Sequence, residues 1–365
     1  MERKDIYLWL KSINGVTNKV VQLIENQVEN IDEIIRLSDK EILNLKNINT
    51  NIKENIVKYK SLAYLDNIKE DLHKKNIQYI CHTDEKYPQN LRNIYDVPKI
   101  LFYKGNINVT KNIILGMVGS RKCSDYGKYN AINISKKLSD CGINIVSGLA
   151  YGIDSYCHEG CMSGKSKTIA VLPSSVDNPL PKSSIKIGNK ILDDNGLLIS
   201  EYLPNDKVYK SNFYARNRII SGISDGVIVV EASQESGALI TVDYALEQGK
   251  NVFAIPGNIN SYMSKGCNKI IKEGAKLVDE LEDILSEYKI ISIKDEENCK
   301  NYDNIILNDD SIKVIDTIKN NGILHIDEIC DNTKMEIKYL NTILGELVLN
   351  DILIEMNNKK YSLNL

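Results

Sequence analysis

Short runs of isoleucine, valine and leucine alternate with helix-length segments between about residues 113 and 285, and glycine, serine or proline marks each junction. Because these apolar runs are continuous, they predict strands buried on both faces, as in a parallel sheet covered by helices. The pattern therefore predicts a doubly wound α/β fold with its binding site at the carboxyl ends of the strands. The expected strands are Ile113–Val118, Ile143–Ser147, Thr168–Leu172, Leu197–Ser200, Val227–Glu231 and Val252–Ile255.

The chain of 365 residues is long enough for further domains on either side of this core. From Ile6 to about Leu72 the apolar residues fall at helical spacing, with asparagine-rich breaks between short segments. The tail reads as three helices followed by a hairpin, which is the element order of a winged helix. We expect a helical domain at 1–75, the core at 76–290, a linker at 291–308 and a winged-helix domain at 309–365.

Two segments of the flanking domains bear on nucleic-acid binding. The break Ile13–Thr17 contains one glycine and is SAM- or helix-hairpin-helix-like, a turn whose backbone amides can meet a phosphate. The second candidate turn, Leu45–Asn49, has no glycine, so packing or partner docking is the alternative. In the tail the segment Lys334–Leu349 is close to neutral, which favours a protein contact or a structural role over reading duplex DNA.

The balance of charges limits the kind of nucleic-acid site that the chain can have. Its 46 lysines and arginines are nearly matched by 49 acids, for a net charge of −3, which argues against a protein that coats duplex DNA by charge alone. Eight cysteines without CxxC spacing indicate free thiols in a reducing compartment. No signal peptide or membrane-length apolar run is seen, so we expect a cytoplasmic protein with no membrane contact.

The first candidate anion site follows the first predicted strand. There the chain runs into Gly119, Ser120 and Arg121 and then into a helix beginning near Tyr126. Such a turn points free amides and the positive helix end at one place, Gly119 lets a ligand approach the backbone, and Arg121 can pair with a phosphate. The alternative is an ordinary tight turn with an exposed arginine.

Two more loops repeat this pattern of small residues after a strand. Ser147 and Gly148 open a loop with two glycines, and Asp154 is expected to cap the helix that follows. Ser236 and Gly237 start another helix with small donors. A further loop, from Pro256 onward, again carries glycines, so these loops together would form a groove along one sheet edge.

One loop combines cations with aromatic rings, which is how single strands are gripped without sequence reading. Its residues of interest are Lys210, Phe213, Tyr214, Arg216, Asn217 and Arg218. In the alternative interpretation Phe213 is a core residue, and the two arginines pair with acids such as Glu201 and Glu231.

The sequences of these loops, and their order along the chain, resemble those of the DNA-processing protein A (DprA/Smf) family over about residues 80 to 285. The motifs that carry the resemblance are Gly-Ser-Arg at 119–121, Ser-Gly-Leu-Ala-Tyr-Gly-Ile-Asp at 147–154, Asn-Phe-Tyr-Ala-Arg-Asn-Arg-Ile-Ile at 212–220, Ser-Gly-Ala-Leu-Ile-Thr at 236–241 and Pro-Gly at 256–257. The chain departs from the family at Asn178–Pro181, where a Tyr-Pro is usual, and at Pro173–Ser175, where glycines are common.

The resemblance implies a Rossmann-like core that binds single-stranded DNA. It places the DNA around Gly119, Ser120 and Arg121, with Lys210 and Phe213 as further contacts. The resemblance further implies that Arg216, Asn217 and Arg218 shape the same edge of the sheet. It also implies a homodimer that protects incoming single strands and contacts the RecA recombinase during natural transformation or recombination.

The competing class is a hydrolase of the nucleoside-monophosphate phosphoribohydrolase type. Those enzymes carry a Pro-Gly-Gly-x-Gly-Thr turn with a downstream glutamate, whereas Ser236–Thr241 lacks the glycines and an obvious acid. No nucleophile-base pair or Walker A motif is present, so we expect neither catalysis nor a cofactor. Cys157, His158 and Cys161 could be imagined as metal ligands, but we expect two buried thiols beside a solvent-facing histidine and no metal.

Overall fold

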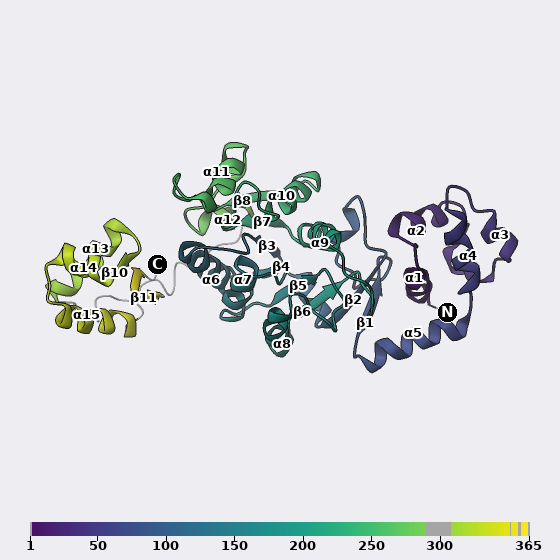
Figure 1. The fold of residues 1–365 in the computed structure, drawn as a ribbon, viewed down its shortest axis with the longest axis horizontal. Coiled ribbons are helices and arrows are strands. Elements are labelled where there is room, and N and C mark those ends of the chain that lie inside the picture. Colours follow the sequence, from purple (N-terminus) through teal and green to yellow (C-terminus); the bar gives the residue numbers. More distant parts are fainter. Residues whose placement is uncertain (1, 289–307, 351, 357–358, 364–365) are drawn as a thin grey trace. The chain divides into compact units, whose positions relative to one another are not determined.

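The computed structural model describes residues 2–288, 308–350, 352–356 and 359–363 and divides the chain into two compact units, residues 1–290 and 291–365 (Figure 1). The predicted linker, 291–308, lies outside the described residues except for its last position. No helix in the described ranges is long and apolar enough to cross a membrane.

The larger unit is built on a nine-stranded, mostly parallel sheet in the order β1-β2-β6-β5-β4-β3-β7-β8-β9. All six predicted strands are present with ends within two residues, so the prediction of an α/β fold with a mostly parallel sheet is confirmed. The pattern missed β1, β2 and β9, of which β1 and β2 pair antiparallel at one edge. The strands are β1 (Gln78–Cys81), β2 (Ile100–Gly105), β3 (Ile114–Val118), β4 (Asn144–Ser147), β5 (Thr168–Leu172), β6 (Leu197–Ser200), β7 (Gly226–Val229), β8 (Asn251–Ala254) and β9 (Lys276–Leu277).

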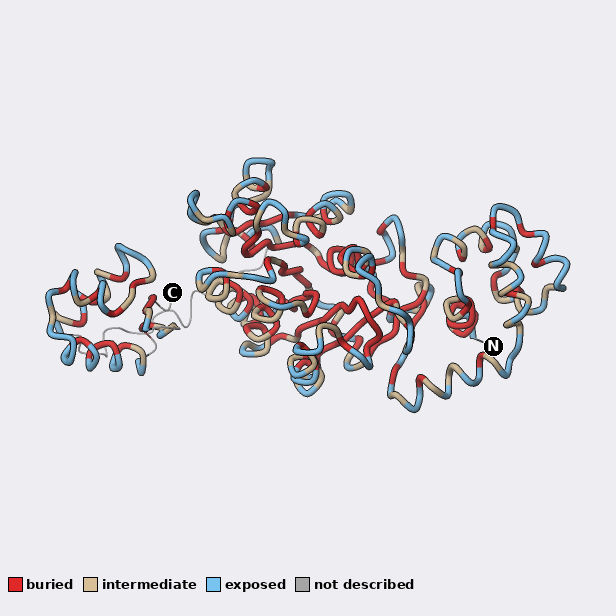
Figure 2. The backbone as a smooth tube through the Cα atoms, in the orientation of Figure 1, coloured by how far each residue is buried: buried red, intermediate tan, exposed pale blue. Residues whose placement is uncertain are grey.

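Helices cover both faces of this sheet, as the continuous apolar strands require (Figures 1 and 2). Successive side chains of β3 point to opposite faces: Val118 packs with residues of α9 and α10, and Met117 packs with residues of α6 and α7. The helices of this region are α6 (Asp125–Asp140), α7 (Ile153–Met162), α8 (Ile185–Asp193), α9 (Lys210–Ile223), α10 (Ala238–Glu247), α11 (Lys265–Lys272) and α12 (Glu282–Leu285). Each helix that follows a parallel strand starts at the carboxyl edge, so the predicted loops gather there.

Five short helices precede the sheet and belong to the same compact unit. They are α1 (Arg3–Ser12), α2 (Asn18–Glu25), α3 (Asp39–Leu43), α4 (Thr50–Lys58) and α5 (Leu62–Lys74). Buried Trp9 donates to the backbone oxygen of Tyr59 at 2.8 Å and lies in one apolar cluster with Phe102 of β2. Lys99 and Glu25, 2.7 Å apart, add an ion pair between these helices and the sheet region.

The turns that join these helices contain two left-handed residues. Gly15 has φ +90 between α1 and α2, as the glycine of a tight helix-to-helix turn should. Asn47, between α3 and α4, has φ 59, so it adopts the left-handed conformation for which a turn usually has glycine. Asparagine tolerates this conformation better than other residues with a side chain.

The smaller unit contains three helices and a three-stranded antiparallel sheet in the order β10-β12-β11. Its elements are α13 (Asp309–Asn321), β10 (Leu324–His325), α14 (Ile326–Thr333), α15 (Ile337–Leu349), β11 (Leu353–Met356) and β12 (Lys360–Leu363). Leu340, Ile343 and Leu344 of α15 form its core with Val314 of α13 and Ile329 of α14. This unit therefore has an apolar core of its own.

Replacement of exposed Asn47 tests its left-handed backbone. Asn47→Val should lower the free energy of unfolding by about 1–2 kcal/mol, because a β-branched side chain is strained at positive φ. Asn47→Gly should stay within about 0.5 kcal/mol of the parent, as should the matched change at the exposed neighbour, Lys46→Val. Urea unfolding followed by circular dichroism measures this, and equal stability of the two valine variants would contradict the assignment.

Candidate functional site

The loops at the carboxyl edge of the sheet enclose an open pocket of about 440 Å³. Eight of the predicted site residues line it, namely Gly119, Ser120, Arg121, Phe213, Arg216, Asn217, Ser236 and Gly237. The other four, Ser147, Gly148, Lys210 and Arg218, do not. Sequence reasoning missed Lys122, Tyr262 and Met263 as lining residues, although the first directly follows Arg121 and the other two lie in the last predicted loop.

Arg121 and Phe213 place an exposed cation beside an aromatic ring in the pocket. The guanidinium carbon of Arg121 lies 5.4 Å from the ring centroid of Phe213, within the range of a cation–π contact. Phe213 is half-buried in the first turn of α9, whereas Arg121 is exposed. The pair therefore presents a planar, oriented cation beside an aromatic ring at the mouth of the pocket.

The turn that contains Gly119 and Ser120 is not the open anion site that its sequence predicts. The backbone amide of Ser120 already donates to the backbone oxygen of Glu231, at 2.7 Å. The Glu231 carboxylate accepts from the amide and hydroxyl of Ser124, the N-cap of α6, at 2.8 and 2.6 Å. A carboxylate of the protein thus occupies the positive end of α6 where a ligand was expected.

Two glycines that were expected to admit a ligand instead admit other parts of the protein. A Cβ on Gly119 would lie 2.6 Å from the side chain of Ile153 and 2.8 Å from the backbone oxygen of Glu231. A Cβ on Gly148 would lie 2.6 Å from the guanidinium carbon of Arg216. Both positions therefore need glycine for internal packing.

Arg216 is buried beneath the pocket and ties α9 to two strands. Its guanidinium donates to the backbone oxygens of Gly148, after β4, and of Val171 in β5. Burial lowers the pKa of Arg216 to about 10, and nearby Asp154 opposes that shift. The structure therefore uses Arg216 as a brace for the floor of the pocket.

Asp154 has a different role from the predicted helix cap. Its carboxylate accepts from the backbone amides of Gly148 and Ala150, at 3.2 and 3.4 Å, and the N-cap of α7 is Gly152. Burial raises the pKa of Asp154, while Arg216 acts in the opposite direction. Asp154 therefore holds the loop after β4 closed.

The segment from Lys210 to Arg218, predicted as a loop, is the first part of α9. Within it Arg218 belongs to a buried ion pair, as the alternative interpretation of this segment has it. Its guanidinium donates to both oxygens of Glu201, at 2.8 and 2.7 Å, and to Asp96 at 2.9 Å. Burial acts to lower the pKa of Arg218, but the two carboxylates raise it above its usual value. Glu231, the other acid considered, bonds Ser124 instead. The Arg218 side chain thus joins α9 to the loops that contain Asp96 and Glu201.

The start of α10 is the part of the pocket that is left open. The position of a Cβ on Gly237 has nothing within 4 Å, and Gly237 is exposed. Ser236 accepts from the backbone amide of Ala238 at 3.3 Å and lines the same wall as Thr241. An anionic ligand can therefore approach the backbone and the positive end of α10 here.

The loop after β5, where the chain departs from the family pattern, packs against α9. The hydroxyl of Ser174 donates to the backbone oxygen of Asn178 at 2.8 Å, and Asn212 donates to the backbone oxygen of Pro173 at 3.3 Å. The Leu180–Pro181 peptide bond in this loop is cis. The departure thus still supports the first turn of α9, next to Phe213.

The prediction of a solvent-facing His158 is wrong. His158 is fully buried, and its Nδ1 lies 2.6 Å from the hydroxyl of Thr168. That hydroxyl donates to the backbone oxygen of Ile145, so Nδ1 carries the proton and donates, while Nε2 has no partner among the described residues. Burial, with the charge of Arg216 as a second cause, lowers the pKa of His158 to about 3.

Within the described ranges no group of three or more histidine, cysteine, aspartate or glutamate residues is placed to hold a metal ion. Cys157 and Cys161, which flank His158 on α7, are both buried, as predicted. Burial raises the pKa of the Cys161 thiol to about 11, so this thiol is protonated at neutral pH.

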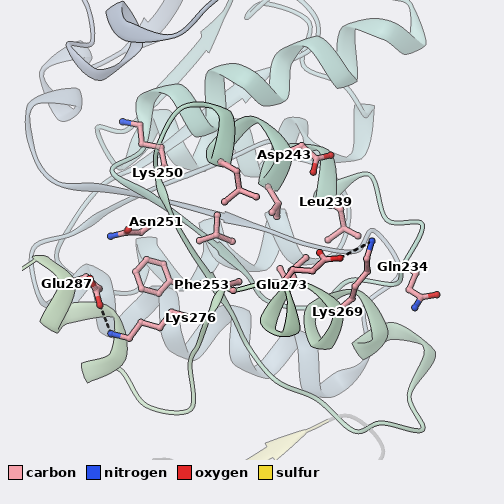
Figure 3. Close-up of a pocket in the computed structure, with 16 residues that line it drawn as sticks. Gln234, Leu239, Asp243, Lys250, Asn251, Phe253, Lys269, Glu273, Lys276 and Glu287 are labelled. Atoms are coloured by element: carbon pink, nitrogen blue, oxygen red, sulfur yellow. Dashed lines mark hydrogen bonds and ion pairs between the residues drawn. The ribbon is translucent and has the colours of Figure 1, made fainter.

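A second cavity, of about 510 Å³, lies among α10, β8, β9 and α11 (Figure 3). None of the predicted site residues lines it. Lys269 pairs with Glu273 at 3.6 Å, and Lys276 pairs with Glu287 at 2.7 Å. Four of the charged side chains that line the cavity therefore already form ion pairs with one another. The carboxyl-edge pocket therefore remains the candidate for an anionic ligand.

Comparison with known proteins places the chain among DNA-processing proteins. A family model described as DNA recombination-mediator protein A matches residues 78–289. The DNA processing protein DprA of Streptococcus pneumoniae is 37% identical over 285 residues, which cover 78% of this chain and 98% of that protein. Protein Smf of Escherichia coli is 39% identical over 214 residues, which cover 59% of this chain and 57% of that protein.

Two solved structures are similar to this chain in fold as well as in sequence. The structure of DNA processing protein A from Streptococcus pneumoniae matches with a TM-score of 0.67 and 35% identity over 79% of this chain and 99% of that chain. DNA processing protein A from Helicobacter pylori matches with a TM-score of 0.53 and 28% identity over 59% of this chain and 97% of that chain. The latter structure describes that protein's unique single-stranded DNA binding mode.

The depressed pKa of His158 predicts acid sensitivity. Between the folded pKa of about 3 and an unfolded value of about 6.5, the unfolded chain binds more protons, so stability falls as the pH drops through this window. His158→Asn removes the titration, so the loss of unfolding free energy from pH 7 to pH 5 should shrink by about 2 kcal/mol. Urea unfolding at both pH values measures it. The same change at exposed His73 should leave the loss unaltered, and an unaltered loss in His158→Asn would contradict the burial argument.

Proposed function

The chain belongs to the DNA recombination-mediator protein A family, and from this membership we propose that it binds single-stranded DNA in the pocket at the carboxyl edge of its sheet. The observation that carries the proposal is the Arg121 guanidinium held over the ring of Phe213 at the mouth of that pocket. A phosphate can pair with the cation while a base stacks on an adjacent ring. The single-strand binding of the Helicobacter pylori relative supports the same ligand.

Several features favour a single strand over a duplex at this place. Exposed rings such as Tyr214 and Tyr262 line the pocket, and a base must be unpaired and unstacked before it can lie on them. The open start of α10 can take a backbone phosphate beside Gly237. Since these groups contact ring faces and phosphates and read no base edges, binding should tolerate many sequences.

We further propose that the protein binds without catalysing a reaction. Asp154 is the one acid among the residues that line the pocket, and it accepts hydrogen bonds from two backbone amides. The hydrolase alternative would need an acid free to act at the start of α10, where the sequence supplies Ser236–Thr241. Release of free base from nucleoside monophosphates by the purified protein would overturn this proposal.

Family membership also supports loading of RecA onto the bound strand by a homodimer in the cytoplasm, during natural transformation or recombination. RecA filament formation on strands coated by a single-strand binding protein tests the loading step. No acceleration by this protein would overturn it, and a monomeric mass by light scattering would overturn the homodimer.

We propose that the two flanking regions serve contacts other than the main grip on the single strand. The smaller unit follows winged-helix order, and the turn at Gly15 with its counterpart at Asn47 is consistent with a SAM- or helix-hairpin-helix-like domain. On α15 the exposed residues Ile337 and Tyr339 favour a protein contact over duplex reading. Removal of residues 308–365 should leave affinity for single strands within about twofold.

Arg121→Ala tests the proposed site directly. Loss of one phosphate contact and of the cation beside Phe213 should weaken oligo-dT binding by about tenfold to a hundredfold and reduce the salt slope by about one. Fluorescence anisotropy with duplex competitor and varied salt measures both quantities. The matched control is Lys190→Ala. Lys190 is an exposed cation in the second half of α8, from which the chain leads to the amino end of β6.

The control variant should bind as the parent does. Equal affinity of the Arg121→Ala and Lys190→Ala variants would contradict the placement of DNA at the pocket.

A further inference from the structure

Exposed tyrosines gather at the carboxyl edge of the sheet. Seven tyrosines in the described part of the chain are exposed, and five of these follow the parallel strands β3, β4, β6 and β8 at this edge. They are Tyr126, Tyr151, Tyr209, Tyr214 and Tyr262, with exposures between 38% and 59%. Single exposed tyrosines are common on protein surfaces, but five of seven at one edge is a pattern that calls for a cause.

Tyr214 and Tyr262 line the pocket, and the other three rings continue the row along the edge. Tyr209 follows β6, Tyr151 follows β4 and Tyr262 follows β8, while Tyr126 lies in the first turn of α6 after β3. From β6 to β8 the strand order β6-β5-β4-β3-β7-β8 contains five inter-strand steps. At about 4.8 Å for each step, the row extends roughly 24 Å.

The rings are available to a ligand. Tyr126 is held in place by its hydroxyl, which donates to the backbone oxygen of Pro256 at 2.7 Å. Within the described ranges Tyr151, Tyr209 and Tyr262 make no side-chain hydrogen bond and no ring contact. A base that stacks on such rings displaces water from apolar surface that folding has left exposed.

Cations accompany the tyrosines along the same edge. Lys207 lies two residues before Tyr209, Lys122 follows Arg121, and Lys265 starts α11 just after Tyr262. All three lysines are exposed, and none makes an ion pair within the described ranges. The edge therefore offers aromatic faces and positive charge together, which complements the bases and phosphates of one strand.

We propose that Tyr209, Tyr151 and Tyr126 extend the pocket, which Tyr262 lines, into a track on which consecutive bases of single-stranded DNA stack. This inference rests on the proposed function and adds the path of the strand, from the loop after β6 to the loop after β8. A track of this length holds roughly four to six nucleotides. Because stacking uses the ring and not the hydroxyl, Tyr151→Phe, Tyr209→Phe and Tyr262→Phe should each leave binding of the strand unchanged.

The test compares strand length and ring chemistry in the full chain. The double variant Tyr209→Ser with Tyr151→Ser removes two rings of the track that do not line the pocket, and both side chains are exposed, so folding should be retained. Anisotropy with four-nucleotide and twelve-nucleotide oligo-dT should show short-strand affinity unchanged and long-strand affinity reduced by about tenfold or more. The phenylalanine pair should bind as the parent does, and so should Tyr339→Ser, which changes an exposed tyrosine of α15 in the smaller unit.

The outcomes separate this inference from the function on which it rests. Unchanged long-strand binding by the double serine variant, together with a loss in Arg121→Ala, would overturn the track and leave the pocket in place. Equal loss on short and long strands would also overturn the track, because it would place those tyrosines in the pocket contact itself. No single-strand binding by the parent protein would overturn the proposed function and the track together.

Discussion

The buried guanidinium of Arg216 is the contact on which the arrangement of the pocket depends. It joins α9 to the backbone ends of β4 and β5 and so sets the position of the first turn of that helix. Phe213 lies three residues earlier, on nearly the same face of α9, and its ring positions Arg121. The buried guanidinium of Arg216 thus determines the position of the exposed guanidinium of Arg121.

The carboxyl edge divides its polar groups into two sets with different roles. Glu231, Asp154 and Glu201 satisfy helix ends, loop amides and a buried arginine inside the protein. Arg121 and the start of α10 at Gly237 remain open. Because the internal acids are already paired with groups of the protein, the open groups can meet a ligand without leaving one of these carboxylates unpaired.

The strands could be predicted from the sequence because their signal is local. An apolar run bounded by glycine specifies a buried strand whatever lies elsewhere, whereas the antiparallel strands β1 and β2 lacked that alternation with helices and were missed. The partners of the charged side chains could not be predicted. Arg218 meets Asp96 across 122 positions of sequence, and burial of His158 depends on how α7 packs on the sheet.

The central claim is that a single strand lies across the carboxyl edge, and photocrosslinking tests it most directly. Oligo-dT with one photoreactive base at varied positions can be irradiated on the full chain and the adducts located by mass spectrometry. Our account predicts adducts at Phe213 and Tyr214 near the start of α9 and at Tyr262 after β8, which are lost when unlabelled strand competes. Adducts confined to residues 2–74 or 308–363, with none along the carboxyl edge, would contradict it.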